Sequence, residues 1–470
     1  MNIEIKQETL IKKLIDIFGE HNVLSSEEER YVYSFDCSNF LDVNNIANAV
    51  VLAEDKDQLI KLVKLSNEFK IPLIPRAAGT NHVGSCVPLF GGIIVSFAKM
   101  DKIIEIDEIN MIARVEPGLI IKDLQDKVES IGLFFPPDPS NLKISTIGGA
   151  IAQNSGGPRG FKYGIIKDYT LDLEVILPDG RVINTSKPCH KNSAGYHLTP
   201  LFIGSEGTLG IITQATLKLI PKPQDNNVML VYFDDLEDAS KAVCGIFSHH
   251  ILPSALELLD QKTLQTIEKF RPSGFLTEFE ACLLIEVDGF SNTLDYQCQT
   301  IKNICEKFNS KNIIIAKDKQ EYDNIWVARR SAYACCTKLD YNVIAEDIVV
   351  PRQYIPKVVK EIKSISDKYN LTVCIMGHIG DGNIHPNFAL DLQNKAVLDN
   401  FYKARQEILD FVISLQGSIT GEHGIGFEKS NMIKKMYPKA NIEIMNSIKT
   451  IIDKNNIMNP GKILIDMDYN

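Results

Sequence analysis

Three glycine-bearing loops in the first half of the chain are the feature that most constrains its fold. They occupy residues 75–81, 145–157 and 204–210. Glycine lets the backbone approach a ligand closely and leaves N–H groups free to bind phosphate. One such loop is more often a surface turn, but three in one domain favour a backbone laid along an extended ligand. A nicotinamide site is disfavoured, because no G-x-G-x-x-G motif joins a first strand to a helix.

Hydrophobic periodicity around these loops predicts a mixture of helices and strands in the first half. Strands are expected at 49–53, 71–74, 93–97, 103–107, 112–116, 171–177 and 211–219, with the runs from 93 to 116 forming an antiparallel sheet. Helices are expected after Asp55, which starts a capping-box-like pattern with Gln58, and at 119–130. The stretch 134–164 is expected to be a long loop, and such loops are uncommon unless they are functional.

The second half alternates apolar runs of strand and helix type. Strands are expected at 229–233, 282–287, 312–316 and 371–376, and helices at 236–249, 293–308, 352–369 and 394–415. This alternation is typical of an α+β domain. The segment Pro221-Lys222-Pro223-Gln224 has the composition of a linker, so the first domain boundary is expected there.

The charge and cysteine pattern exclude several classes of protein. Sixty acidic against fifty basic residues give a formal charge of −10, so a nucleic-acid-binding surface is not expected. No window approaches ~18 uninterrupted apolar residues, and residues 1–18 have the pattern of an amphipathic helix rather than a signal peptide. None of the ten cysteines forms a C-x-x-C pair, which disfavours a bound iron–sulfur cluster. We therefore expect a cytoplasmic protein without a membrane span.

The segment from Met376 to Asn387 predicts a metal site built on a hairpin. Asp381-Gly382 is a strong two-residue turn signal, and such a turn places His378 directly opposite His385 on one face of the hairpin. Opposed residues have Cβ atoms about 4.5–5.5 Å apart, close enough for two imidazoles to share one ion. Asn387 lies on the same face. Two histidines that only pack on each other are the structural alternative.

The segment Gly421-Glu422-His423-Gly424 offers a third ligand. On an extended backbone the side chains of Glu422 and His423 point in opposite directions, so different roles are expected for them. Glu422 completes a set of two histidines and one carboxylate, which leaves coordination positions open as catalytic zinc or ferrous sites require. His423 remains for proton transfer, since its ordinary pKa is near ~6.5. The metal would be divalent, with Zn²⁺, Fe²⁺ and Mn²⁺ all compatible.

The three loop motifs, Pro75-Arg76-Ala77-Ala78-Gly79-Thr80, the stretch 145–157 and Gly204-Ser205-Glu206-Gly207-Thr208-Leu209-Gly210, resemble the FAD-binding domain of the vanillyl-alcohol-oxidase/PCMH-type flavoproteins. The chain is similar from about residue 46 onward to their D-lactate, glycolate and D-2-hydroxyglutarate dehydrogenase branch. The resemblance implies an α+β fold with an FAD-binding domain at 1–222, an antiparallel α+β substrate (cap) domain at 223–420, and a C-terminal segment, 421–470, that returns to the FAD domain.

The same resemblance implies which residues hold the cofactor. FAD is expected to be non-covalent, because Thr80 stands where some relatives carry a tethering histidine; a tether through His82 is the less favoured alternative. The expected FAD contacts are Pro75, Arg76, Ala77, Ala78, Gly79, Thr80, Asn81, His82, Pro139, Ser145, Thr146, Gly149, Asn154, Ser155, Gly156, Gly207 and Ile211.

The resemblance also implies the substrate class and the partners. Arg329 matches the arginine that clamps the substrate carboxylate, although a basic pair with Arg330 on a helix surface is the alternative. Ala345 stands where D-2-hydroxyglutarate enzymes carry a lysine, which favours D-lactate, then glycolate. Electrons are expected to pass to a protein acceptor, such as electron-transfer flavoprotein, within an oligomer or complex. A D-2-hydroxyglutarate dehydrogenase and a non-catalytic flavin subunit stay open as alternatives.

Overall fold

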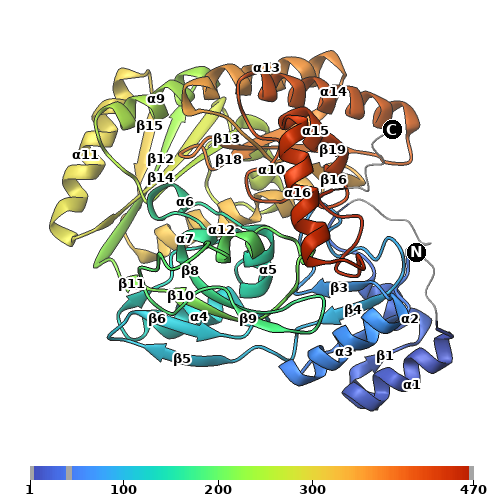
Figure 1. Cartoon of the computed structure of the whole chain (residues 1–470). Coiled ribbons are helices and arrows are strands. Elements are labelled where there is room, and N and C mark those ends of the chain that lie inside the picture. Colours follow the sequence, from blue (N-terminus) through green and yellow to red (C-terminus); the bar gives the residue numbers. More distant parts are fainter. Residues whose placement is uncertain (1–4, 39–44, 465–470) are drawn as a thin grey trace.

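The computed structural model describes residues 5–38 and 45–464. Its two halves lie one above the other, and the C-terminal helix α16 (Lys439–Ile452), red in the view, runs from the upper half toward the lower one (Figure 1). The elements of the first half are α1 (Gln7–Phe18), β1 (Val23–Leu24), α2 (Glu27–Tyr33), β2 (Ala49–Leu52), α3 (Lys56–Phe69), β3 (Leu73–Arg76), β4 (Ile93–Ser96), β5 (Ile103–Asp107), β6 (Ile112–Val115), α4 (Ile121–Glu129), β7 (Leu133–Phe134), α5 (Ile147–Gln153), α6 (Gly160–Tyr163), α7 (Ile166–Tyr169), β8 (Thr170–Ile176), β9 (Val182–Asn184), α8 (Thr199–Phe202), β10 (Ile211–Lys218) and β11 (Ile220–Pro221).

The elements of the second half are β12 (Asp225–Phe233), α9 (Leu236–Ser248), β13 (Ala255–Asp260), α10 (Gln261–Phe270), β14 (Ala281–Gly289), α11 (Ser291–Lys307), β15 (Asn312–Ile315), α12 (Lys319–Cys336), β16 (Asn342–Ala345), β17 (Ile348–Val349), α13 (Ile355–Lys368), β18 (Thr372–Gly377), β19 (Asn383–Leu390), α14 (Lys395–Ser414), α15 (Ile433–Met436) and α16 (Lys439–Ile452). The fold is therefore α+β, as the sequence predicts. Where one domain ends and the next begins stays a prediction.

Two sheets make up most of the first half. A four-stranded sheet has the order β1-β2-β4-β3, and a five-stranded antiparallel sheet has the order β5-β6-β10-β8-β9. The prediction that residues 93–97 belong to the antiparallel sheet is wrong, because β4 runs parallel to both β2 and β3. All four residues of β4 are buried, as a parallel strand covered on both faces requires.

The stretch 134–164 is not the structureless loop that the sequence predicts, because it contains α5 and α6. Thr146 caps α5 by accepting a hydrogen bond from the Gly149 amide at 3.2 Å. Glycines weaken the helical pattern of this segment, but they serve packing: a Cβ on Gly148 would lie 2.6 Å from the Pro117 side chain. The helix therefore depends on a contact that is distant in sequence.

The second half is built on one large sheet with both faces covered. Its order is β15-β12-β14-β13-β18-β19-β16, with β17 also paired to β19. Side chains alternate along β12: Met229, Val231 and Phe233 pack toward α9, α11, α13 and α14, whereas Leu230 and Tyr232 pack toward α10 and α12. Helix α12 thus lies on the sheet face that leads to the candidate site.

The C-terminal segment packs against the first half of the chain. Ile448 of α16 contacts the core of the five-stranded sheet, and Met458 is fully buried in the core of the four-stranded sheet. The Leu73 amide of β3 donates to the Ile457 carbonyl at 2.7 Å, and the Asn459 amide donates to the Leu73 carbonyl at 2.8 Å. Among the described residues no helix is both long enough and apolar enough to cross a membrane.

Candidate active site

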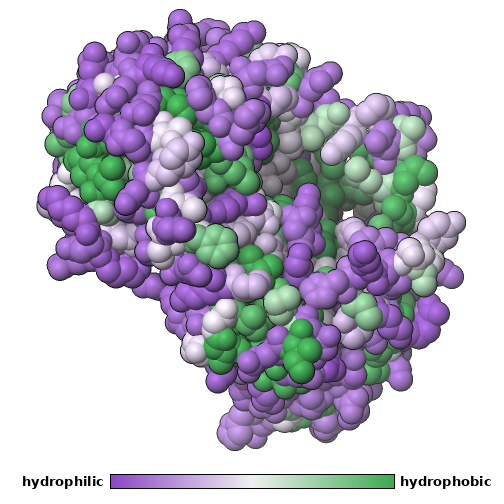
Figure 2. Space-filling model, turned by 90° about the vertical axis from the view of Figure 1, so that its left-hand side faces the viewer, coloured by the Kyte–Doolittle hydropathy of each residue, from purple (hydrophilic) through white to green (hydrophobic). Residues whose placement is uncertain are grey.

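A cavity of about 490 Å³ joins all three glycine loops to the second half of the chain. The space-filling view shows the surface hollowed between the two halves (Figure 2). Most of the residues predicted to contact FAD line this cavity: Pro75, Ala77, Ala78, Gly79, Thr80, Asn81, His82, Pro139, Ser145, Thr146, Gly149, Ser155 and Gly207. Helix α12 and strands β16, β18 and β19 contribute the opposite wall.

Four other residues predicted to bind FAD do not line the cavity, each for a physical reason. The Arg76 guanidinium donates to the Phe35 carbonyl at 2.7 Å. Asn154 ends α5 in the left-handed conformation, with φ 52°. Ile211 is fully buried in the core. Gly156 makes room for a different group, since a Cβ there would lie 2.9 Å from Glu422 Oε2.

The hairpin of β18 and β19 brings the two predicted histidines together, but not in the predicted register. Met376 lies opposite His385, so His378 follows β18 inside a longer loop and the two histidines are diagonal neighbours. The prediction that they are directly opposed is wrong. Ile379 explains the longer loop, because its fully buried side chain anchors the turn in the core. The shift is by two residues, so both rings stay on one face with centroids 5.2 Å apart.

Gly382 in this loop is expected to be intolerant of a side chain. Its φ is +86°, and a Cβ would lie 2.1 Å from the Val350 carbonyl oxygen. Gly274 is a matched control, because its φ is +85° but a Cβ added there would meet nothing within 4 Å. We expect Gly382→Ala to lower the free energy of unfolding by about 1–3 kcal/mol more than Gly274→Ala, measured by urea denaturation. Equal losses would show that the overlap with Val350 relaxes without cost.

His378, His385 and Glu422 converge on one point. Glu422 Oε1 lies 3.3 Å from His378 Nε2 and 3.3 Å from His385 Nε2. Ligand atoms about 2.0–2.1 Å from a tetrahedral ion stand about 3.3–3.4 Å apart, so this donor set fits a divalent metal. Burial opposes the charged form of Glu422, but the two imidazoles overcome it and hold the pKa of this carboxyl well below its usual range.

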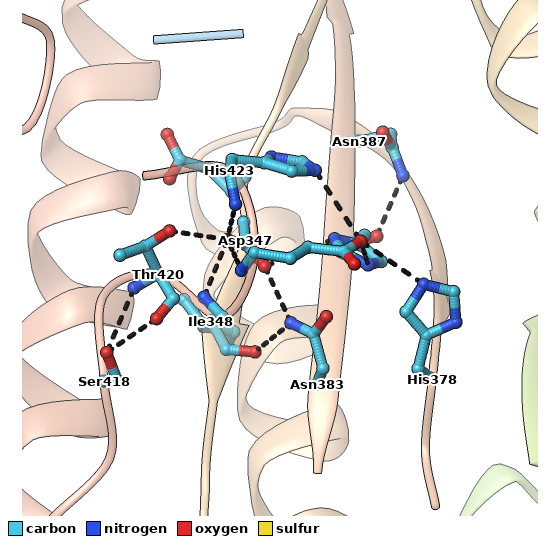
Figure 3. Close-up of polar contacts among 12 residues, drawn as sticks. Asp347, Ile348, His378, Asn383, Asn387, Ser418, Thr420 and His423 are labelled. Atoms are coloured by element: carbon cyan, nitrogen blue, oxygen red, sulfur yellow. Dashed lines mark hydrogen bonds and ion pairs between the residues drawn. The ribbon is translucent and has the colours of Figure 1, made fainter. Parts of the chain in front are cut away.

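Asp347 shapes the loop that carries Glu422 and His423. Its Oδ2 accepts hydrogen bonds from the Thr420 hydroxyl at 2.7 Å and from the amides of Gly421, Glu422 and His423 at 2.7, 2.9 and 3.0 Å (Figure 3). The loop therefore curls around one carboxylate and is not extended. The prediction that the two side chains point in opposite directions is wrong: His423 Nε2 lies 4.0 Å from Glu422 Oε1.

A second set, Asp347, His385 and His423, also lies close enough to hold an ion. Its carboxylate is already committed, because Oδ2 has four donors and Oδ1 accepts from the Asn383 side-chain amide at 2.7 Å. Few lone pairs remain for a metal. The set of His378, His385 and Glu422 is therefore the better candidate.

The buried carboxylate of Asp347 is also expected to contribute to the stability of the fold. Burial opposes the carboxylate, but His423, His385 and Lys429 hold its pKa well below the ordinary aspartate value of 3.8. A pKa depressed in the folded state stabilises the fold above pH ~3.8, and that stability is lost as the pH falls below it. We expect Asp347→Asn to lower the free energy of unfolding at pH 7 by on the order of 3 kcal/mol, measured by urea denaturation. The loss should shrink in acid; a loss equal at pH 7 and pH 3 would contradict this role for the carboxylate.

His423 stands beside the cluster in its neutral form. Its ring stacks on His385 with centroids 5.2 Å apart and an interplanar angle of 16°. Burial, with the neighbouring His385 and His82, lowers the pKa of His423 to about 4. Its Nδ1 is buried and has no hydrogen-bond partner among the described residues. A neutral imidazole with a free ring nitrogen can accept a proton from a group in the cavity.

Arg329 is buried, so the alternative that it forms a basic pair with Arg330 on a helix surface does not hold for this residue. It is 5% exposed, lines the cavity, and forms an ion pair between its Nη2 and Glu257 Oε2 at 2.6 Å. Arg330 is more exposed and lies 3.8 Å from Asp138 Oδ2. Glu257 is absent from the sequence prediction, although a lone glutamate within the apolar run 255–259 was a usable signal.

Asn387 and Ala345 form part of the opposite wall. They are partners across β19 and β16, and both line the cavity. The Asn387 side-chain amide donates to the His385 carbonyl at 2.9 Å, which fixes the side chain and leaves its Oδ1 to accept a hydrogen bond. The structure thus places all six predicted metal and catalytic residues, His378, His385, Glu422, His423, Arg329 and Asn387, on one cavity.

Glu206, in the third glycine loop, is another buried group that the site prediction omits. It lines the cavity and accepts hydrogen bonds from the Ser85 hydroxyl at 2.6 Å and from the Ile425 amide at 2.8 Å. Burial raises the pKa of its carboxyl. Glu206 therefore ties the glycine loops to the segment that follows His423.

Comparisons with known proteins identify the family to which the chain belongs. Residues 47–186 match the family described as an FAD binding domain, and residues 222–463 match the family described as FAD linked oxidases, C-terminal domain. The "Glycolate oxidase subunit GlcD" of Bacillus subtilis is 41% identical over 96% of both chains. The "D-lactate dehydrogenase" of Anaerostipes hadrus is 34% identical, over 88% of this chain and 89% of the relative.

A solved structure of p-cresol methylhydroxylase has the same fold, with a TM-score of 0.82, 18% identity and 98% of each chain covered. The fold and the cavity thus define a flavoprotein of the vanillyl-alcohol-oxidase/PCMH type. More narrowly, the chain belongs to the FAD-linked oxidase family, and its relatives include proteins named glycolate oxidase subunits and D-lactate dehydrogenases.

Proposed function

We propose that this protein oxidises a small D-2-hydroxy acid to the 2-oxo acid, using non-covalent FAD and a divalent metal held by His378, His385 and Glu422. The observation that carries the proposal is the 3.3 Å convergence of this donor set on a cavity that continues to the glycine loops. When bound, FAD would accept the Cα hydrogen of the substrate as a hydride at N5, and the metal would lower the pKa of the substrate hydroxyl. Zn²⁺, Fe²⁺ and Mn²⁺ all suit these ligands.

The protein's own side chains would bind the substrate, accept its proton and orient it. Arg329 binds the substrate carboxylate, because its guanidinium lies at the cavity surface and presents N–H donors in a planar fork. His423 accepts the hydroxyl proton on a ring nitrogen, since its lowered pKa keeps it neutral at pH 7. Asn387 orients the substrate by accepting a hydrogen bond. His385 and His423, stacked together, keep the base beside the metal ligands.

The residues in the cavity wall favour a small substrate. Ala345 offers no charge to a second carboxylate, so D-lactate is preferred and glycolate is next. Relatives named glycolate oxidase subunit and D-lactate dehydrogenase support a small 2-hydroxy acid as the substrate. The word "subunit" in the name of the Bacillus subtilis relative supports assembly into a complex. We propose that electrons pass within it to a protein acceptor, such as electron-transfer flavoprotein. We propose that this complex is cytoplasmic.

Anaerobic mixing with candidate substrates tests the proposal. Holoprotein loaded with FAD and metal should lose its visible flavin absorbance with D-lactate, more slowly with glycolate, and least with D-2-hydroxyglutarate. Faster reduction by D-2-hydroxyglutarate would identify the alternative dehydrogenase. No reduction by any of the three, with both groups bound, would favour a non-catalytic flavin subunit.

A further inference from the structure

Glu257 connects the metal ligands to the substrate clamp. The side chain is fully buried, and its two carboxylate oxygens have different partners. His378 Nδ1 donates to Oε1 at 2.7 Å, and Arg329 Nη2 contacts Oε2 at 2.6 Å. Three elements meet here, since Glu257 lies on β13, His378 follows β18, and Arg329 lies on α12.

We propose that Glu257 is a positioning residue that orients the metal ligand His378 and the carboxylate clamp Arg329 together. The inference rests on the proposed function, because Glu257 can have this role only if His378 binds a metal and Arg329 binds the substrate.

The contact with His378 fixes which ring nitrogen faces the cavity. When Nδ1 carries the proton that Glu257 accepts, Nε2, which lies 3.3 Å from Glu422 Oε1, keeps its lone pair for a metal ion held between the two atoms. Metal-binding histidines are commonly oriented in this way by a carboxylate, and loss of that partner typically lowers metal affinity or activity about 10–100-fold.

The second contact of Glu257 positions the proposed substrate clamp, Arg329. Arg329 is 5% exposed, its Nη1 contacts Met376 Sδ at 3.7 Å, and its Nε has no hydrogen-bond partner among the described residues. Glu257 is therefore the carboxylate that neutralises this buried guanidinium, through a contact at Nη2. A guanidinium held at Nη2 leaves its other N–H groups available to a ligand in the cavity. One carboxylate thus contacts both the metal ligand and the clamp.

Glu257→Gln tests the proposal, because the amide keeps the size of the side chain but cannot accept from both partners. We expect Zn²⁺ affinity of the FAD-loaded protein, measured against a competing chromophoric chelator, to fall about 10–100-fold. The KM for D-lactate should rise, because Arg329 loses its fixed orientation. Glu257→Asp keeps the charge but is one methylene shorter, so it should also weaken Zn²⁺ binding, and it provides a folded variant if the amide does not fold.

Glu286→Gln is the matched control. Glu286 is also fully buried, on the neighbouring strand β14, and accepts from the Tyr322 hydroxyl at 2.5 Å and the Trp326 indole at 2.7 Å. This change should lower the unfolding midpoint and leave Zn²⁺ affinity unaltered. Unchanged Zn²⁺ affinity in folded Glu257 variants would overturn this inference alone. Wild-type protein that binds none of Zn²⁺, Fe²⁺ and Mn²⁺ would overturn the proposed function as well.

Discussion

Replacing Glu422 by glutamine should remove the metal and slow the reduction of FAD by D-lactate at least about 10³-fold. The carboxylate lies 3.3 Å from each of two imidazole nitrogens, and a neutral amide is a poor third ligand. A metal contributes several kcal/mol of charge stabilisation, and about 4 kcal/mol corresponds to a factor of 10³ in rate. The rate would be followed by stopped-flow absorbance and the metal by elemental analysis.

Two features make this change interpretable. The loop around Glu422 is held by amides that donate to Asp347, so the substitution leaves its anchoring intact. Glu428→Gln is a control for loss of a carboxylate, since Glu428 is partly buried and lies 3.9 Å from Arg405 rather than beside the histidines. A Glu422 variant that keeps both metal and rate would contradict the assignment of the ligand.

Replacing His423 by asparagine should slow the same reduction by about 10²–10⁴-fold while metal and FAD contents stay unchanged. The imidazole is neutral at pH 7, because burial with His385 and His82 lowers its pKa to about 4. The base form is therefore present above pH ~4, and kcat/KM of the wild type should fall only as the pH drops toward that value. A loss of less than tenfold in the variant, or an acid limb of the wild type that the variant retains unchanged, would argue against His423 as the base.

Much of the fold follows from short-range patterns. The amphipathic helices α9, α11 and α14 and the buried strands β12, β14 and β18 lie close to their predicted positions, because their side-chain periods are local. Strand β4 differs because its direction depends on partners elsewhere. Helix α3 connects β2 to β3, so these two strands run in the same direction, and β4 pairs in parallel with both. Nothing within residues 93–96 encodes this parallel pairing.

The candidate site likewise combines residues that short motifs predict with residues that only the fold brings together. The residues that could carry the chemistry were visible in two short motifs, around His378 and around Glu422. The groups that arrange them were not, because 121 residues separate Glu257 from His378 and 76 separate Asp347 from His423. A distant carboxylate imposes the curl of the loop at 420–423, so the side chains of Glu422 and His423 do not alternate as they would on an extended backbone.

The metal dependence of flavin reduction tests the central claim most directly. FAD-loaded protein would be mixed anaerobically with D-lactate before chelation, after removal of the metal to a level verified by elemental analysis, and after its return. We predict that the rate collapses on removal of the metal and recovers when one divalent ion per chain is restored. An undiminished rate in protein that retains FAD but no metal would contradict the proposed metal-assisted oxidation.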